Sequence, residues 1–152
     1  DPVAGRRAFA LKFGATHVKD PIIDDLIAQC QSLTNNIGMD YAFETAGIAK
    51  LAEVAIAVIR PGGSVICVGA APLDQGIEIN PFTLFSSFEK KLCGCLMGSC
   101  NSLREIPRLA SLWQSKQLNL EDMVTNRRPL AEINEAFDDL RAGRGSRTVL
   151  EI

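Results

Sequence analysis

The segment from Ser64 to Gly69 is an almost uninterrupted run of apolar and β-branched residues. A half-exposed strand alternates polar and apolar side chains, whereas a run of this kind is typical of a parallel strand buried on both faces. Residues 60–63 precede it with a proline and two glycines, which predict a turn. The run therefore predicts a central strand of a layered α/β fold.

Strand-like and helix-like segments alternate along the rest of the chain. We expect helices at about 2–13, from Pro21 to about 35, at 49–59, from Pro81, and at 103–116 and 130–141. We expect strands or extended segments at 16–18, 39–44, 64–69, 77–79, 91–97, 123–128 and 148–152. Because strands joined by helical crossovers pair in parallel, this order predicts an α/β fold with a parallel sheet.

The composition and net charge of the chain indicate which kinds of partner it is suited to bind. The chain has 152 residues, 47% of them hydrophobic, and a net charge of -2. A near-neutral chain gives no electrostatic case for nucleic acid or an anionic membrane as partner. There is no apolar run long enough to span a bilayer and no leader-like start. We therefore expect a cytoplasmic protein with neither nucleic-acid nor membrane partners.

Five cysteines raise the question of disulfides or a metal. An odd number cannot pair completely, and several lie in apolar strand-like runs, so we expect reduced thiols that act as small core residues. Cys93, Cys95 and Cys100 are the alternative metal ligands. The spacing typical of zinc sites is missing and the single histidine, His17, is distant in sequence, so we predict no metal site. We also find no motif for catalysis.

Ligands of open parallel sheets bind beyond the carboxyl ends of the strands. In this chain those ends are Asp1 and the segments 45–47, 68–72 and 95–99, most of them rich in glycine and other small residues. Small residues let a flat cofactor approach the backbone, although glycines that simply end strands explain the pattern equally well. We expect Glu44, next to the first of these segments, to be a structural acid that accepts hydrogen bonds.

Taken together, the motifs resemble the zinc-dependent medium-chain alcohol dehydrogenases over the whole chain. The resemblance is carried by residues 1–17, Gly38–Gly47, Pro61–Gly63 with Val68 and Gly69, 120–125, 130–137, and the closing stretch 143–150. It implies a Rossmann-type parallel sheet with helices on both faces, lacking its first strand and glycine-rich turn. We expect residues 1–100 to be a partial dinucleotide-binding domain, and 101–152 to return toward an absent catalytic domain.

The resemblance also implies a set of cofactor contacts. Asp1 would accept hydrogen bonds from the adenosine ribose, and its charge would favour NAD over NADP. Arg6 matches a basic position near that ribose, and Arg147 matches an arginine on the pyrophosphate, where a guanidinium fits paired oxygens. The remaining implied positions line the adenosine, the nicotinamide carboxamide or the substrate: Thr45, Ala46, Val68, Gly69, Ala70, Cys95, Leu96 and Met97.

The resemblance implies the C-terminal part of an enzyme that moves hydride between NAD and a small alcohol or aldehyde. Its zinc ligands would lie outside this chain, so we expect the chain alone to be inactive. Family members pair through a sheet edge, which predicts a homodimer or homotetramer through residues 91–100. Two alternatives stay open: a zinc-free quinone reductase of the same superfamily, and an inactive nucleotide-binding or oligomerisation module.

Overall fold

The computed structural model describes residues 1–152, which form two compact units. One unit contains residues 21–100, and the other combines residues 1–20 with residues 101–152. Contacts within the chain define these units, whereas the domains expected from the family resemblance, 1–100 and 101–152, concern the architecture of a longer protein. Those domains stay a prediction.

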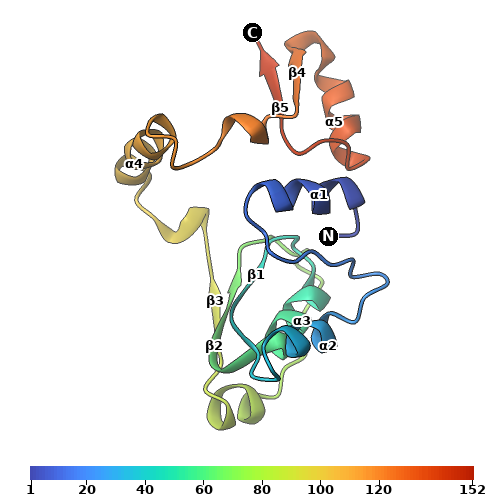
Figure 1. The fold of residues 1–152 in the computed structure, drawn as a ribbon, viewed down its shortest axis with the longest axis vertical. Coiled ribbons are helices and arrows are strands. Elements are labelled where there is room, and N and C mark those ends of the chain that lie inside the picture. The colour runs from blue at the N-terminus through green and yellow to red at the C-terminus, as the bar shows by residue number, and fades with distance from the viewer. The chain divides into compact units, whose positions relative to one another are not determined.

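The unit of residues 21–100 is built on a parallel sheet of three strands. The strands β1 (Met39–Glu44), β2 (Ile59–Cys67) and β3 (Lys91–Gly94) lie side by side in chain order (Figure 1). Phe43 pairs with Ile66, and Ile66 pairs with Cys93. The predicted α/β class with parallel strands is confirmed, and the carboxyl ends of all three strands meet at one edge of the sheet.

The core of this unit lies between the sheet and α3 (Ala49–Val58). This helix packs on β1 and β2 and against α2 (Leu26–Leu33). Its alanine and aliphatic residues are small enough for close packing on a sheet, and Ala49, Ala52 and Val58 are buried. The β-branched run of β2 supplies the opposing surface, with Val65 fully buried. The predicted central strand is thus confirmed, but it ends at Cys67, and burial on both faces is not borne out, because Ser64, Ile66 and Cys67 are only half-buried and Val68 is exposed.

The helix predicted from Pro21 begins five residues later than expected. Residues 21–24 form turns, and α2 begins after Asp25. The Asp25 carboxylate accepts hydrogen bonds from the backbone N–H groups of Ile27 and Ala28, both at 3.0 Å. A carboxylate that satisfies the free N–H groups of a first turn is a strong helix start, so this cap sets the boundary.

The turn predicted at residues 60–63 is part of β2. Met39 pairs with Ile59 and Tyr41 with Ser64, so the longer β2 segment bulges between these two pairs. Gly62 has a φ of 74°, and its N–H donates to the Phe88 carbonyl at 2.8 Å. Proline and glycine are tolerated in a strand at a bulge, which explains why the turn signal did not end the strand.

The segment around β3 also differs from the sequence-based expectation. The helix expected from Pro81 is the π-type turn η1 (Phe82–Ser87), and residues 77–79 are not in a strand. The expected strand 91–97 ends at Gly94, which pairs with Cys67, the last residue of β2, and further on Met97 and Ser99 have φ values of 49° and 51°. Left-handed backbone cannot continue a strand; it forms the short turn η2 (Met97–Ser99).

The second unit contains the remaining elements. They are α1 (Ala4–Lys12), α4 (Ser102–Gln114), η3 (Glu121–Met123), β4 (Asn126–Pro129), η4 (Leu130–Glu132), α5 (Ile133–Arg141) and β5 (Thr148–Glu151). The strands β4 and β5 pair in parallel, and α5 packs beside β4 (Figure 1). No helix in either unit combines the length and apolar character needed to cross a membrane.

The strand predicted at residues 16–18 is absent. Residues 16–18 pair with no strand, and the nearby bond from the N-terminal nitrogen of Asp1 to the Lys19 carbonyl, at 3.0 Å, lies just outside the segment. A strand is stabilised by a ladder of hydrogen bonds with a neighbour. Without that ladder, the favourable residue types of the segment do not produce a strand.

We predict that the buried position in β2 dominates the stability of its unit. Val65→Ala removes two buried methyl groups and should lower the free energy of unfolding by about 2 kcal/mol, measured by urea denaturation. The control Ile23→Ala removes a larger side chain that is 80% exposed, and should change it by less than about 0.5 kcal/mol. Equal effects would contradict the described core.

Candidate functional site

The loop after β1 is organised by the Glu44 carboxylate. This side chain is 6% exposed. One oxygen, Oε1, accepts the N–H of Ala46 at 2.8 Å and of Ile48 at 3.4 Å, and Oε2 accepts the N–H of Gly47 at 3.1 Å. The acid therefore satisfies backbone donors that would otherwise be buried and unpaired, and its predicted structural role is confirmed.

Two glycines bring the first and second loops into backbone contact. Val68 and Gly69 both donate their N–H groups to the Glu44 carbonyl, at 2.8 and 2.9 Å. A Cβ on Gly69 would overlap the Gly47 nitrogen and lie 2.7 Å from Oε2 of Glu44. A Cβ on Gly47 would lie 2.6 Å from the Ala70 carbonyl oxygen. Only glycine fits this crossing, which places the two loops side by side.

The structure brings eight of the predicted positions to this edge of the sheet. Thr45 and Ala46 follow β1, the predicted positions 68–70 follow β2, and the predicted positions 95–97 follow β3. The third segment is tied to its neighbour by the Cys95 N–H, which donates to the Cys67 carbonyl at 3.0 Å. The resulting edge is a strip of backbone and small side chains, with exposed Leu96 and Met97 at its β3 end.

The other three predicted residues belong to the unit that contains both ends of the chain. One oxygen of the Asp1 carboxylate, Oδ1, accepts the Val3 N–H at 2.8 Å, and the side chain is exposed. Arg7 holds this segment in place, since its Nη1 donates to the Asp1 carbonyl at 2.6 Å and to Asp20 at 2.9 Å. Arg7, rather than Arg6, is thus the structural arginine here.

The Arg6 guanidinium has no hydrogen-bond or ion-pair partner in the structure. It lines a hollow of about 270 Å³ between α1 and the segment 143–146, together with Val3, Phe9 and Thr125. The terminal nitrogen Nη2 of Arg6 is the atom nearest to the position that a Cβ on Gly143 would occupy, at 3.5 Å. An unpaired, half-buried guanidinium at a hollow is suited to an anionic or hydroxyl-bearing ligand.

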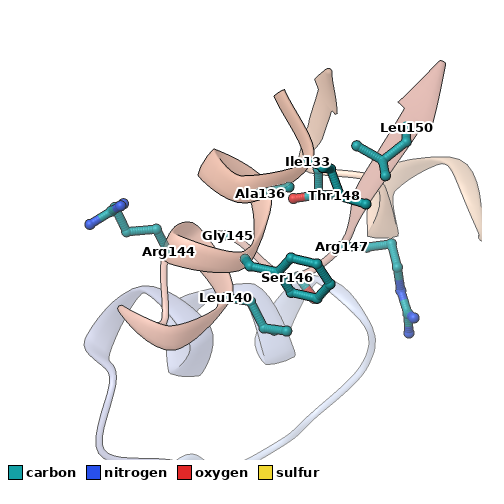
Figure 2. Close-up of a pocket in the computed structure, with 10 residues that line it drawn as sticks. Ile133, Ala136, Leu140, Arg144, Gly145, Ser146, Arg147, Thr148 and Leu150 are labelled. Atoms are coloured by element: carbon teal, nitrogen blue, oxygen red, sulfur yellow. The ribbon is translucent and has the colours of Figure 1, made fainter. Parts of the chain in front are cut away.

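Arg147 lies on a turn that is held firmly at its backbone. Thr125 Oγ1 accepts the N–H of Ser146 at 2.8 Å and of Arg147 at 3.2 Å, and the backbone N–H of Thr125 donates to the Arg147 carbonyl at 2.9 Å. The Arg147 side chain itself is exposed and has no partner. Figure 2 shows Arg144 and Arg147 extending in opposite directions from this turn, beside a hollow of about 240 Å³.

The other end of the turn is anchored by Asp139, a carboxylate of α5 that is 7% exposed. Arg144 Nε donates to Oδ1 of Asp139 at 2.7 Å, and Arg128 Nη2 donates to Oδ2 at 2.6 Å. These two guanidinium groups hold the pKa of Asp139 below its usual range, Arg144 having the larger effect. In turn, the hydrogen bonds that Arg128 donates to Asp139 and to Glu132 raise the pKa of Arg128.

The side chains of residues 1–152 offer no place for a metal ion. No group of three or more His, Cys, Asp and Glu residues is arranged to hold one. All five cysteines are free thiols. The expectation that the cysteines fill the core is wrong for Cys93 and Cys100, which are exposed, and the other three are only half-buried. Cys93 lies on β3, an outer strand of the sheet.

Sequence reasoning missed the residues that hold the turn of Arg147. The sequence places Thr125 in an extended segment and in the family-like stretch 120–125, and Asp139 in a helix, and it indicates no contact for either side chain. Thr125 binds Arg147, which lies 22 residues away in the sequence, and Asp139 binds Arg128, which lies 11 residues away. No local sequence pattern therefore indicates these contacts. The glycines at 143 and 145 were a signal, because their φ values of 66° and 72° mark a specific turn.

Comparison with known proteins places this geometry in a family. A model of the family described as zinc-binding dehydrogenase matches residues 1–115. An NDMA-dependent alcohol dehydrogenase of Amycolatopsis methanolica is 36% identical over 152 residues, which are 99% of this chain and 41% of that protein. The chain thus spans about two fifths of the length of this relative.

Solved structures agree in fold over the full chain. A benzyl alcohol dehydrogenase from Acinetobacter calcoaceticus superimposes with a TM-score of 0.93 at 26% identity, covering 100% of this chain and 41% of that one. An alcohol dehydrogenase zinc-binding domain protein from Burkholderia ambifaria superimposes with a TM-score of 0.92 at 26% sequence identity. The match covers 100% of this chain and 40% of that one. The Rossmann-type character of the parallel sheet is therefore confirmed.

We predict that the crossing of the two glycines is sensitive to one added methyl group. Gly69→Ala should lower the free energy of unfolding by about 1–3 kcal/mol, because the backbone of Gly47 must move. The control Gly94→Ala adds the same group at the end of β3, where nothing lies within 4 Å, and should change it by less than about 0.5 kcal/mol. Urea denaturation measures both, and a tolerated Gly69→Ala would refute the crossing.

We predict a pH dependence from Asp139. Because its pKa is lower in the folded state, its ion pairs stabilise the fold fully above about pH 4, the ordinary range of an aspartate, and less as the pH falls through the lowered value. Asp139→Asn should therefore be less stable than the wild type at neutral pH, with the difference shrinking in acid.

Urea denaturation across a pH series measures this difference. The neighbouring Asp138→Asn removes an exposed ion pair with Arg141 and should give a much smaller difference at every pH. A difference between Asp139→Asn and wild type that is independent of pH would contradict the assignment.

Proposed function

We infer that this chain, which belongs to the zinc-binding dehydrogenase family, supplies the NAD-binding part of an alcohol dehydrogenase. The observation that carries the inference is Arg147, an exposed and unpaired guanidinium on a turn whose backbone is fixed by hydrogen bonds. A guanidinium fork that extends from a fixed turn is suited to the paired oxygens of a pyrophosphate. The alcohol dehydrogenase relatives support the reaction class.

The residues present fit a dinucleotide. The loops after β1 and β2 cross at Gly47 and Gly69 without room for a Cβ on either residue, and the residues beside the crossing are mostly small, which suits the approach of a flat ring system to the backbone. The hollow beside Arg6 lies in the unit that carries Asp1 and Arg147. When bound, NAD supplies the hydride acceptor at its nicotinamide ring.

Each predicted residue has a proposed part in holding this cofactor. Asp1 accepts the hydroxyl groups of the adenosine ribose, and its charge repels the 2′-phosphate of NADP. Arg6 lies near the same ribose, and Thr45 and Ala46 pass the adenosine. The backbone at Val68 and Gly69, and at Cys95 and Met97, would hold the nicotinamide carboxamide. Ala70 and Leu96 border that substrate, a small alcohol or aldehyde.

Zinc belongs to the proposed enzyme but not to this chain. No arrangement of its side chains suits a metal ion, so we assign the zinc ligands to sequence outside residues 1–152 and derive no step that uses zinc here. The five free thiols fit a reducing compartment such as the cytoplasm.

We further propose that β3 forms a subunit interface. This strand pairs with β2 on one side only, so its other edge presents free backbone donors and acceptors. Pairing of this edge between two copies, through residues 91–100, would produce a homodimer, or a homotetramer of two such pairs.

We predict that Arg147→Met weakens NADH binding by the native protein that carries this chain. The loss of charge-assisted hydrogen bonds to the pyrophosphate should raise the Kd about 10- to 100-fold, measured by the nicotinamide fluorescence of NADH. The control Arg141→Met removes an arginine of α5 that pairs with exposed Asp138 and should leave the Kd unchanged. A wild type that does not bind NADH, or two variants that bind alike, would contradict the proposal.

A further inference from the structure

The turn at residues 143–147 combines a fixed backbone with one uncommitted side chain. Its two arginines, Arg144 and Arg147, differ in whether the side chain has a partner within the chain. Arg144 is bound to the Asp139 carboxylate, whereas the Arg147 side chain has no partner in the chain. Figure 2 shows the two side chains on opposite sides of the turn. This asymmetry leaves one of the two guanidinium groups free to bind a ligand.

Thr125 fixes the end of the turn from which Arg147 extends. Its hydroxyl accepts two backbone N–H groups, those of Ser146 and Arg147, and donates to the Arg147 carbonyl at 3.2 Å. The Arg147 carbonyl also accepts the N–H groups of Thr125 and Asn126, at 2.9 and 3.1 Å. Both backbone polar groups of Arg147 are therefore bound, which restricts the direction in which its side chain leaves the chain.

Asp139 fixes the opposite end. Its backbone carbonyl accepts the Arg144 N–H at 2.8 Å while its carboxylate accepts Arg144 Nε at 2.7 Å. Arg128 binds the second carboxylate oxygen at 2.6 Å, and Arg128 also pairs with Glu132 at 2.8 Å. The carboxylate is thus held by two arginines, and it keeps the Arg144 guanidinium against α5.

We propose that Thr125 and Asp139 are positioning residues that preorganise Arg147 for a pyrophosphate group. The proposal rests on the proposed function, in which that group belongs to NAD. Fixing a binding side chain before the ligand arrives reduces the conformational entropy that binding must overcome. Neither residue touches the ligand; each acts through the direction in which Arg147 extends.

The test compares two ligands of the native protein that carries this chain. ADP-ribose contains a pyrophosphate and adenosine does not, and calorimetry gives the Kd of each. Thr125→Val removes the hydroxyl at nearly constant shape, and Thr125→Ser is its matched control because it keeps the hydroxyl. Asp139→Asn removes the charge that holds Arg144, and Arg144→Gln is a milder second variant, since Arg144 is largely exposed.

Positioning predicts a loss that is specific to the pyrophosphate. Thr125→Val, Asp139→Asn and Arg144→Gln should each raise the Kd of ADP-ribose about 3- to 10-fold, and leave that of adenosine unchanged; Thr125→Ser should behave as wild type. In the Arg147→Met background these losses should vanish, because the residues act through Arg147.

Two results would overturn the proposal. One is an equal loss of adenosine and ADP-ribose binding, which indicates general damage to the fold. The other is a loss that persists undiminished in the Arg147→Met background. Should Asp139→Asn not fold, Arg144→Gln and Thr125→Val carry the same comparison. Failure of the proposed function is distinguishable, because then the wild type does not bind ADP-ribose or Arg147→Met alone has no effect.

Discussion

The buried carboxylate of Glu44 links the sheet to the surface proposed for the cofactor. The Glu44 carboxylate accepts hydrogen bonds from N–H groups of the loop after β1. The backbone carbonyl of the same residue accepts hydrogen bonds from N–H groups of the loop after β2. Parallel strands bring their carboxyl ends to one edge, but the loops there have backbone donors with no strand partner. Glu44 supplies those partners, and Gly47 and Gly69 then allow the two loops to touch. The strip that a nicotinamide ring could contact depends on this arrangement.

In the unit of residues 1–20 and 101–152, ion pairs between an acid and two arginines fix the segment that carries Arg147. A pyrophosphate requires a positive group in a defined direction, yet an arginine near a carboxylate tends to pair with it. Here Asp139 is paired with Arg128 and Arg144, while the Arg147 side chain has no partner in the chain. Asp139 thus fixes the turn that carries Arg147. Each unit thus fixes, by its own hydrogen bonds, a segment that carries predicted cofactor positions.

The sequence predicted elements whose signal is local and missed features that depend on distant partners. The buried run around Val65 and the alanine-rich α3 were predicted because burial leaves a clear mark on composition. The start of α2 was misplaced because Asp25 caps it later than the proline signal at Pro21. The cofactor positions came from family resemblance, whereas Asp139 binds arginines on both sides of it in the chain, a relation that only folding creates.

The central claim is that this chain holds NAD with Asp1 on the ribose and Arg147 on the pyrophosphate. A crystal structure of the native protein with bound NADH tests it most directly. We expect the Arg147 guanidinium to donate hydrogen bonds to the pyrophosphate oxygens, the Asp1 carboxylate to accept the ribose hydroxyls, and the turn at residues 143–147 to keep its backbone. A bound NADH whose pyrophosphate is contacted by other residues, with Arg147 directed into solvent, would contradict it.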